Sequence, residues 1–176
     1  MNTLPHYVLT GGPCAGKTTT LELLKARGYG VSPEPGRIYF ERQLALGHTL
    51  EELLSDMPKL EKDILREHIE LERLNRKDTH VFFDRGMPDC LAYYRVYGVP
   101  EDEELWDALK NAHYKKVFLL DLIEAFENDS VRIETPEQAK NIHDAIKSAY
   151  EELGHEIVQV PVLPPNERVE FILERL

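Results

Sequence analysis

The sequence alternates short apolar runs with longer segments in which apolar residues recur every three or four positions. The short runs have the length and composition of buried strands, and they span residues 7–10, 29–32, 80–84, 116–120 and 156–160. The periodic segments are typical of amphipathic helices, and they span about 17–27, 37–46, 58–77, 88–97, 101–113, 135–153 and 165–176. Strands that alternate with helices predict a parallel sheet with helices on both faces.

We therefore expect an α/β fold, a three-layer α/β/α sandwich around a five-stranded parallel sheet. The chain has 176 residues, of which 42% are apolar and 30% charged, as in a soluble globular domain. No internal repeat, low-complexity tract or linker interrupts it, so residues 1–176 are expected to form a single domain. Ligands of such folds bind at the carboxyl ends of the strands.

Charge and cysteine content exclude several classes of protein. The 32 acidic and 21 basic residues give a net charge of -11, which argues against nucleic acid or an anionic membrane as a partner. Cys14 and Cys90 are the two cysteines, too few for a disulfide framework or a zinc site. No leader pattern or long apolar stretch is present, so we expect a cytoplasmic protein. The sequence does not indicate an oligomeric state.

Residues 11–18 read GGPCAGKT and match the phosphate-binding (Walker A) pattern G-x-x-x-x-G-K-[ST]. In such a loop, backbone N–H groups surround phosphate oxygens, Lys17 reaches the β- and γ-phosphates, and Thr18 binds Mg²⁺. A glycine-rich turn is the alternative, but the strand before the loop and the helix after it favour nucleotide binding. The expected nucleotide-binding residues are Gly11, Gly12, Pro13, Cys14, Ala15, Gly16, Lys17, Thr18 and Thr19.

Three further charged residues directly follow predicted strands. Asp84 ends the third strand and is a candidate Mg²⁺ ligand, although an aspartate there also often caps a helix. Arg85 could hold a phosphate with two hydrogen bonds, or form an ion pair with an acid. Glu34, between two prolines after the second strand, is placed to accept a proton from a substrate hydroxyl, or is a solvated turn residue.

These motifs resemble, in order and approximate spacing, those of P-loop nucleoside and nucleotide kinases, deoxynucleoside kinases in particular. The segments 84–89 and 131–135 resemble more closely a family of AAA ATPases related to the nicotinamide riboside kinase domain of a bacterial NAD regulator. The resemblance covers nearly the whole chain and implies the strand order 2-3-1-4-5. The third motif departs from the deoxynucleoside kinase pattern, because Gly86 stands where those enzymes usually have serine.

The resemblance also implies roles for individual residues. Lys17 and Thr18 would bind the triphosphate and Mg²⁺, and Glu34 would be the catalytic base. Arg37 and Arg85 would hold the acceptor or the transferred phosphate.

A lid is expected over residues 124–134, where Asn128-Asp129-Ser130 signals a turn, and an ordinary surface loop is the alternative. The resemblance places Arg132 in that lid, next to the nucleotide. Asp89 is expected to cap its helix or to bind an acceptor hydroxyl. Tyr93 is expected to pack against the core or to line the acceptor pocket.

The function that these features favour is an Mg²⁺-dependent kinase that phosphorylates a hydroxyl of a small nucleoside-like metabolite, with Glu34, Lys17, Arg85 and Arg132 as its catalytic residues. ATP is the expected donor because no Asn-Lys-x-Asp motif follows the fourth strand, although GTP stays possible. The alternatives are a nucleotide-binding switch or slow NTPase that acts on a protein partner, and a nucleoside monophosphate kinase. Phosphorylation of nucleic-acid 5′-hydroxyls disagrees with the net charge.

Overall fold

Five parallel strands form one sheet at the centre of the molecule, in the order β2-β3-β1-β4-β5. The computed structural model describes residues 6–75, 80–123 and 135–176. The strands are β1 (His6–Thr10), β2 (Gly30–Ser32), β3 (Val81–Asp84), β4 (Lys116–Leu120) and β5 (Ile157–Val160). Both the five-stranded parallel sheet and its predicted order are confirmed.

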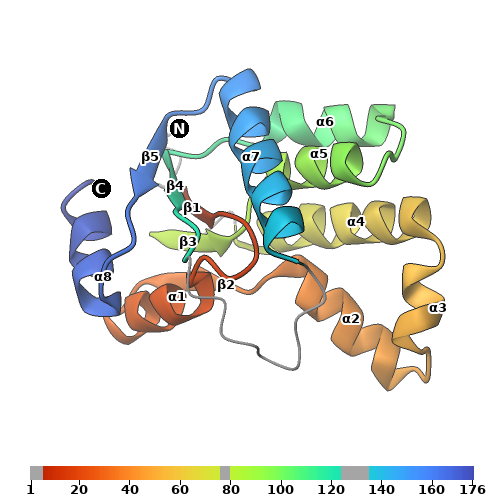
Figure 1. Cartoon of the computed structure of the whole chain (residues 1–176), viewed down its shortest axis with the longest axis horizontal. Coiled ribbons are helices and arrows are strands. Elements are labelled where there is room, and N and C mark those ends of the chain that lie inside the picture. Colours follow the sequence, from red (N-terminus) through yellow and green to blue (C-terminus); the bar gives the residue numbers. More distant parts are fainter. Residues whose placement is uncertain (1–5, 76–79, 124–134) are drawn as a thin grey trace.

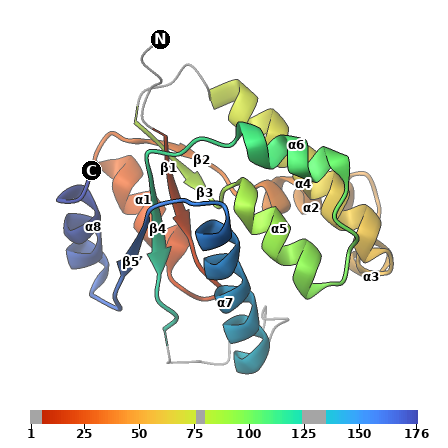
Figure 2. The same ribbon diagram turned by 90° about the horizontal axis from the view of Figure 1, so that it is seen from above.

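Helices cover both faces of the sheet, as Figures 1 and 2 show. One face carries α1 (Lys17–Ala26) and α8 (Pro165–Leu173), which also contact each other. The other face carries α4 (Met57–Asn75), α5 (Met87–Val96), α6 (Glu103–Asn111) and α7 (Pro136–Glu152). The remaining helices, α2 (Pro35–Ala45) and α3 (Leu50–Leu54), pack against α4 at one end of the molecule.

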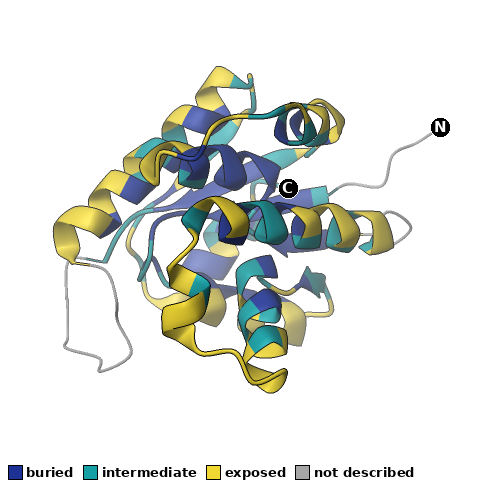
Figure 3. Cartoon of the chain, turned by 90° about the vertical axis from the view of Figure 1, so that its right-hand side faces the viewer, coloured by how far each residue is buried: buried dark blue, intermediate teal, exposed yellow. Residues whose placement is uncertain are grey.

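The apolar runs of the strands divide between the two faces because successive side chains of a strand point in opposite directions. In β1, Tyr7 and Leu9 belong to the core under α1 and α8, whereas Val8 belongs to the core under α4, α5 and α7. Phe82 and its neighbour Phe83 divide in the same way in β3. Figure 3 shows the resulting pattern, in which helices are buried toward the sheet and exposed on their outer faces.

The helix α3 was not predicted from the sequence. Its five residues are too short to show a helical period, and none of them is buried. The local signal is the capping box at its start, where the Thr49 hydroxyl accepts from the Glu52 N–H and the Glu52 carboxylate accepts from the Thr49 N–H. The remaining predicted helices and strands are present, with ends shifted by a few residues.

The carboxyl ends of β1, β2 and β3 lie side by side because these strands are parallel neighbours. The phosphate-binding loop follows β1, Glu34 follows β2, and Asp84 ends β3. Segments that are distant in the sequence therefore meet at one edge of the sheet. No helix within the described ranges is both long and apolar enough to cross a bilayer.

Candidate active site at the carboxyl edge of the sheet

The loop between β1 and α1 has the backbone of a phosphate-binding loop. Gly11 and Gly16 have φ angles of +137° and +80°, a region that favours glycine. A Cβ atom on Gly11 would lie 2.6 Å from the Leu120 carbonyl oxygen, so no larger residue fits there. Cys14 adopts a φ of +65°, whereas Thr18 and Thr19 are exposed at the first turn of α1. The hydroxyl of Thr18 is thus accessible to a ligand.

The Lys17 ammonium is bonded to the first two residues of this loop. Its Nζ atom donates to the carbonyl oxygens of Gly11 and Gly12, at 2.9 Å each. Burial and the nearby charge of Arg85 lower the pKa of Lys17 to about 8. Lys17 is still mostly protonated at neutral pH, so it presents a buried positive charge to an anion in the loop.

The Arg85 guanidinium joins the loop to two acidic residues. Its Nε donates to Glu34 Oε1 at 2.7 Å, and its terminal nitrogen donates to Asp89 Oδ1 at 3.2 Å and to the Gly11 carbonyl at 3.4 Å. The guanidinium also lies 5.3 Å from the centre of the Tyr93 ring, within cation–π range. Arg85 has a φ of +71°, which is uncommon for a residue with a side chain and is often found at functional sites.

Glu34 is the N-cap residue of α2, but its side chain makes no capping hydrogen bond and faces Arg85 instead. Burial alone would raise the pKa of Glu34, but the positive charges of Arg85 and Lys17 outweigh it and lower the pKa to about 2. Glu34 is therefore a carboxylate throughout the physiological pH range. It can accept a hydrogen bond from a hydroxyl group without first losing a proton.

Both carboxylate oxygens of Asp89 accept hydrogen bonds inside the protein. Its Oδ1 accepts from the Thr10 hydroxyl at 2.6 Å in addition to Arg85, and its Oδ2 accepts from the Tyr150 hydroxyl at 2.6 Å and the Gly86 N–H at 3.1 Å. The helix-capping contact, one of the two predicted roles, is present in the structure. Asp89 thus links Arg85 to Thr10 of β1 and Tyr150 of α7.

The hydrogen bond between Tyr150 and Asp89 also explains why residue 86 is a glycine. A Cβ atom at this position would lie 2.6 Å from the Tyr150 hydroxyl and 2.9 Å from Val8 Cγ2. The departure from the serine usual in deoxynucleoside kinases thus accompanies a tyrosine that reaches in from α7 to bind Asp89.

Asp84 fits the predicted role of an Mg²⁺ ligand. Its Oδ1 atom is buried and has no hydrogen-bond partner among the described residues. Burial and the negative charge of Glu34 raise its pKa to about 6, and a cation would compensate both effects. No three histidine, cysteine or acidic side chains of the described residues gather into a metal site. A Mg²⁺ ion held by Asp84 and Thr18 would thus take most of its ligands from phosphate and water.

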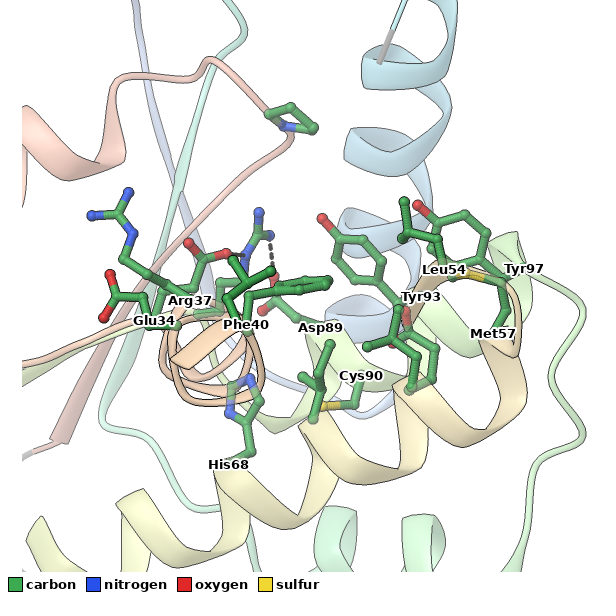
Figure 4. Close-up of a pocket in the computed structure, with 18 residues that line it drawn as sticks. Glu34, Arg37, Phe40, Leu54, Met57, His68, Asp89, Cys90, Tyr93 and Tyr97 are labelled. Carbon is green, nitrogen blue, oxygen red and sulfur yellow. Dashed lines mark hydrogen bonds and ion pairs between the residues drawn. The ribbon is translucent and has the colours of Figure 1, made fainter. Parts of the chain in front are cut away.

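A cavity of about 460 Å³ opens beside Glu34 and Arg85 (Figure 4). Its walls come from α2, α3, α4, α5 and the phosphate-binding loop, through Pro13. Most of the lining is apolar, and Arg37 and Tyr93 contribute to it. Tyr93 also packs against the core, so both of its expected positions are combined. The size of the cavity is in the range of small-molecule sites.

Two contacts to the phosphate-binding loop were not predicted. Arg168 of α8 is buried and donates to the Ala15 carbonyl at 2.8 Å, and His143 of α7 accepts from the Gly12 N–H at 3.2 Å. Arg168, Gly16 and Thr19 also line a second hollow of about 380 Å³, on the α8 side of the loop. No local pattern in the sequence marks either residue, because only the packing of α7 and α8 brings them to the loop. The predicted lid, residues 124–134, and Arg132 within it lie outside the described residues.

The cavity also contains two titratable residues that were not singled out from the sequence. Glu61 and His68 lie on α4, and both are buried among apolar residues of that helix. Burial lowers the pKa of His68 to about 4, so its imidazole is neutral at physiological pH.

Comparisons with known proteins agree with this geometry. A family model described as an AAA domain matches residues 6–168, and none of the curated proteins matches the chain. The solved NadR protein in complex with NR is similar with a TM-score of 0.75 and 16% identity, over 98% of this chain and 51% of that one. This chain thus spans about half the length of the NadR protein.

Two kinases are similar over their whole length. A deoxyadenosine kinase from M. mycoides gives a TM-score of 0.64 and 16% identity, over 97% of both chains. A thymidylate kinase from Ehrlichia chaffeensis gives a TM-score of 0.68 and 16% identity, over 98% of both chains. At this level of identity the likeness shows a shared P-loop kinase fold.

Proposed function

Because this chain belongs to the AAA-domain family and has the fold of P-loop kinases, we propose that it is a kinase of a small nucleoside-like metabolite. In this proposal, the γ-phosphoryl group of ATP is transferred to a hydroxyl group of the acceptor in the presence of Mg²⁺. The observation that supports it most is the Glu34–Arg85 pair, which stands between the phosphate-binding loop and the 460 Å³ cavity.

The arrangement suits transfer to a neutral hydroxyl group. Glu34 accepts a hydrogen bond from the acceptor hydroxyl and takes its proton as the new O–P bond forms, since the carboxylate is ionised beforehand. Lys17 offsets the negative charge that spreads over the transferred phosphoryl group, and Arg85 holds Glu34 in place. When bound, Mg²⁺ would neutralise further phosphate charge, and Thr18 and Asp84 are the residues that would hold it.

A nucleoside monophosphate kinase is the second candidate, supported by the fold shared with the thymidylate kinase. An acceptor phosphate needs several cationic groups around it. Of the described residues that line the cavity, Arg37 and Arg85 are the arginines, and Arg85 already pairs with two carboxylates. This balance of charge favours a hydroxyl acceptor over a phosphate.

The test is release of ADP from ATP and Mg²⁺ across a panel of nucleosides, mononucleotides and vitamin-like alcohols. Stimulation by a nucleoside or alcohol supports the proposal, whereas stimulation by mononucleotides alone supports the second candidate. Nucleotide binding without stimulation by any acceptor would indicate a switch or a slow NTPase. GTP in place of ATP tests the choice of donor.

The variant Glu34→Gln tests the role of the carboxylate. It should lower acceptor phosphorylation by about 10²-fold or more while MgATP binding stays nearly intact. Glu41→Gln is a suitable control, because Glu41 lines the same cavity but is exposed on α2. Unchanged turnover in Glu34→Gln would remove this residue from the role of base.

A further inference from the structure

Glu61 is a buried carboxyl group on the wall of the cavity. Its side chain belongs to α4, and the residue is only 5% exposed. It makes no hydrogen bond or ion pair with any residue in the described part of the chain. The neighbouring wall of the cavity is apolar, with Leu60 and Ile64 on the same helix and Cys90 on α5.

Such a group is costly to keep in an apolar wall. Burial raises the pKa of Glu61 to about 7, with the charge of Arg85 opposing the change. Buried polar groups in folded proteins almost always have a partner. The packing of the described residues gives the Glu61 carboxyl group no partner, so the group needs an explanation outside that packing.

The position of Glu61 along the cavity indicates which part of a ligand it would meet. His68 is two turns further along α4 and is close enough to Glu34 and Asp89 for their charges to affect its pKa. Met57, at the start of α4, lies at the opposite end of the cavity with Leu54 and Tyr97, as Figure 4 shows. Glu61 lies between these two ends in the sequence of α4.

The charge of the lining restricts the ligand further. Above a pH of about 7 Glu61 is a carboxylate, which offers only acceptors of hydrogen bonds, so it then attracts N–H groups and cations and repels carbonyl oxygens. Of the acids in the described lining of the cavity, Glu34 and Asp89 pair with Arg85 and Glu41 is exposed. Glu61 is the buried acid of this lining that has no such pair among the described residues.

We propose that Glu61 determines specificity by binding the ring of the acceptor, and that it selects a ring that carries an amino group or a positive charge. This inference rests on the proposed kinase function for the orientation of the acceptor, with its hydroxyl group at Glu34. Aromatic side chains that line the same cavity, Phe40 and Tyr97 among them, provide surfaces for a flat ring.

Calorimetric binding of matched ligand pairs at pH 8.5, where Glu61 is ionised, tests the inference without requiring catalysis. Cytidine and uridine differ by an amino group in place of a carbonyl, as do adenosine and inosine. A ribosylpyridinium cation and its neutral dihydro form test the effect of charge. The wild-type protein should bind the amino-bearing or cationic member of at least one pair about 10- to 100-fold more tightly, the cost of leaving a buried group without its partner.

Two variants separate recognition from packing. Glu61→Leu should lower the affinity for the preferred ligand to that of the other member of its pair. Glu61→Gln should make the two affinities similar, because an amide both donates and accepts hydrogen bonds. Glu41→Gln, with its exposed carboxyl group, should keep the preference. Equal affinities within every pair, no binding of any of these ligands, a wild-type preference for the carbonyl members, or an unchanged preference in Glu61→Leu would overturn the inference.

The same ligands distinguish this inference from the proposed function. A ligand that binds with the Glu61-dependent preference but does not stimulate ADP release would contradict the kinase proposal and support the role of Glu61. Stimulation of ADP release with equal kcat/KM for both members of each pair would support the kinase and contradict the role of Glu61.

Discussion

The buried carboxyl group of Glu61 makes the stability of the protein depend on pH in a calculable way. Its pKa is about 7 in the folded protein, against an ordinary value of 4.5. Between pH 4.5 and about 7 the unfolded chain therefore loses this proton more readily than the folded one, and the free energy of unfolding falls as the pH rises. Above about pH 7 both states are ionised, and this destabilisation stays constant. Glu61→Gln removes the ionisation and should stabilise the protein.

The gain follows from the two pKa values. Linkage gives about 2 kcal/mol at pH 6.0 and about 3 kcal/mol at pH 8.5, so the gain should grow by about 1 kcal/mol over this interval. Both values of pH lie above the isoelectric point of about 5.1, where the protein keeps a negative charge. Any effect of the amide on packing is the same at both values and cancels in the difference.

Urea unfolding of the wild-type protein and of Glu61→Gln, followed by circular dichroism, measures this difference. Glu41→Gln is the matched control, and its effect should stay within about 0.5 kcal/mol at both values of pH because the residue is on the surface. A Glu61→Gln gain that changes by less than about 0.4 kcal/mol from pH 6.0 to 8.5 would refute the linkage argument.

Other substitutions probe the phosphate site and its support. Lys17→Ala should weaken ATP binding about 10- to 100-fold by calorimetry, because it removes a charged donor, and equal affinities would show that the loop was misinterpreted. Asp84→Asn should raise the Mg²⁺ concentration needed for half-maximal ADP release, and an unchanged requirement would remove Asp84 from the metal site. Gly86→Ser should cost about 1–3 kcal/mol in urea unfolding, since its Cβ atom would meet Tyr150 and Val8, and a neutral effect would contradict the close packing.

The sequence was sufficient to predict the sheet and the residues at its carboxyl edge. Apolar runs such as Lys116–Leu120 are short and bounded, and the motif around Lys17 depends on adjacent residues, so both are visible locally. Glu34 and Asp84 could be placed together because the carboxyl ends of parallel strands share one edge.

The contacts made by helices could not be predicted in the same way. Arg168, His143 and Glu61 approach the site from α8, α7 and α4, and only the packing of these helices brings them there. The partners of Asp89 also come from three separate elements, so its sequence position allowed a cap or a ligand equally. Side chains that act through tertiary packing leave no local pattern in the sequence.

The hydrogen bonds of Arg85 connect the cavity with the phosphate-binding loop, so binding at one site would affect binding at the other. One guanidinium holds Glu34 on the side of the cavity and the Gly11 carbonyl on the side of the phosphate-binding loop. A ligand that draws Glu34 toward itself would change the same side chain that contacts the loop, so the two binding equilibria would be coupled. Thermodynamic reciprocity then requires that any change in nucleotide affinity caused by the acceptor is matched by an equal change in acceptor affinity caused by the nucleotide.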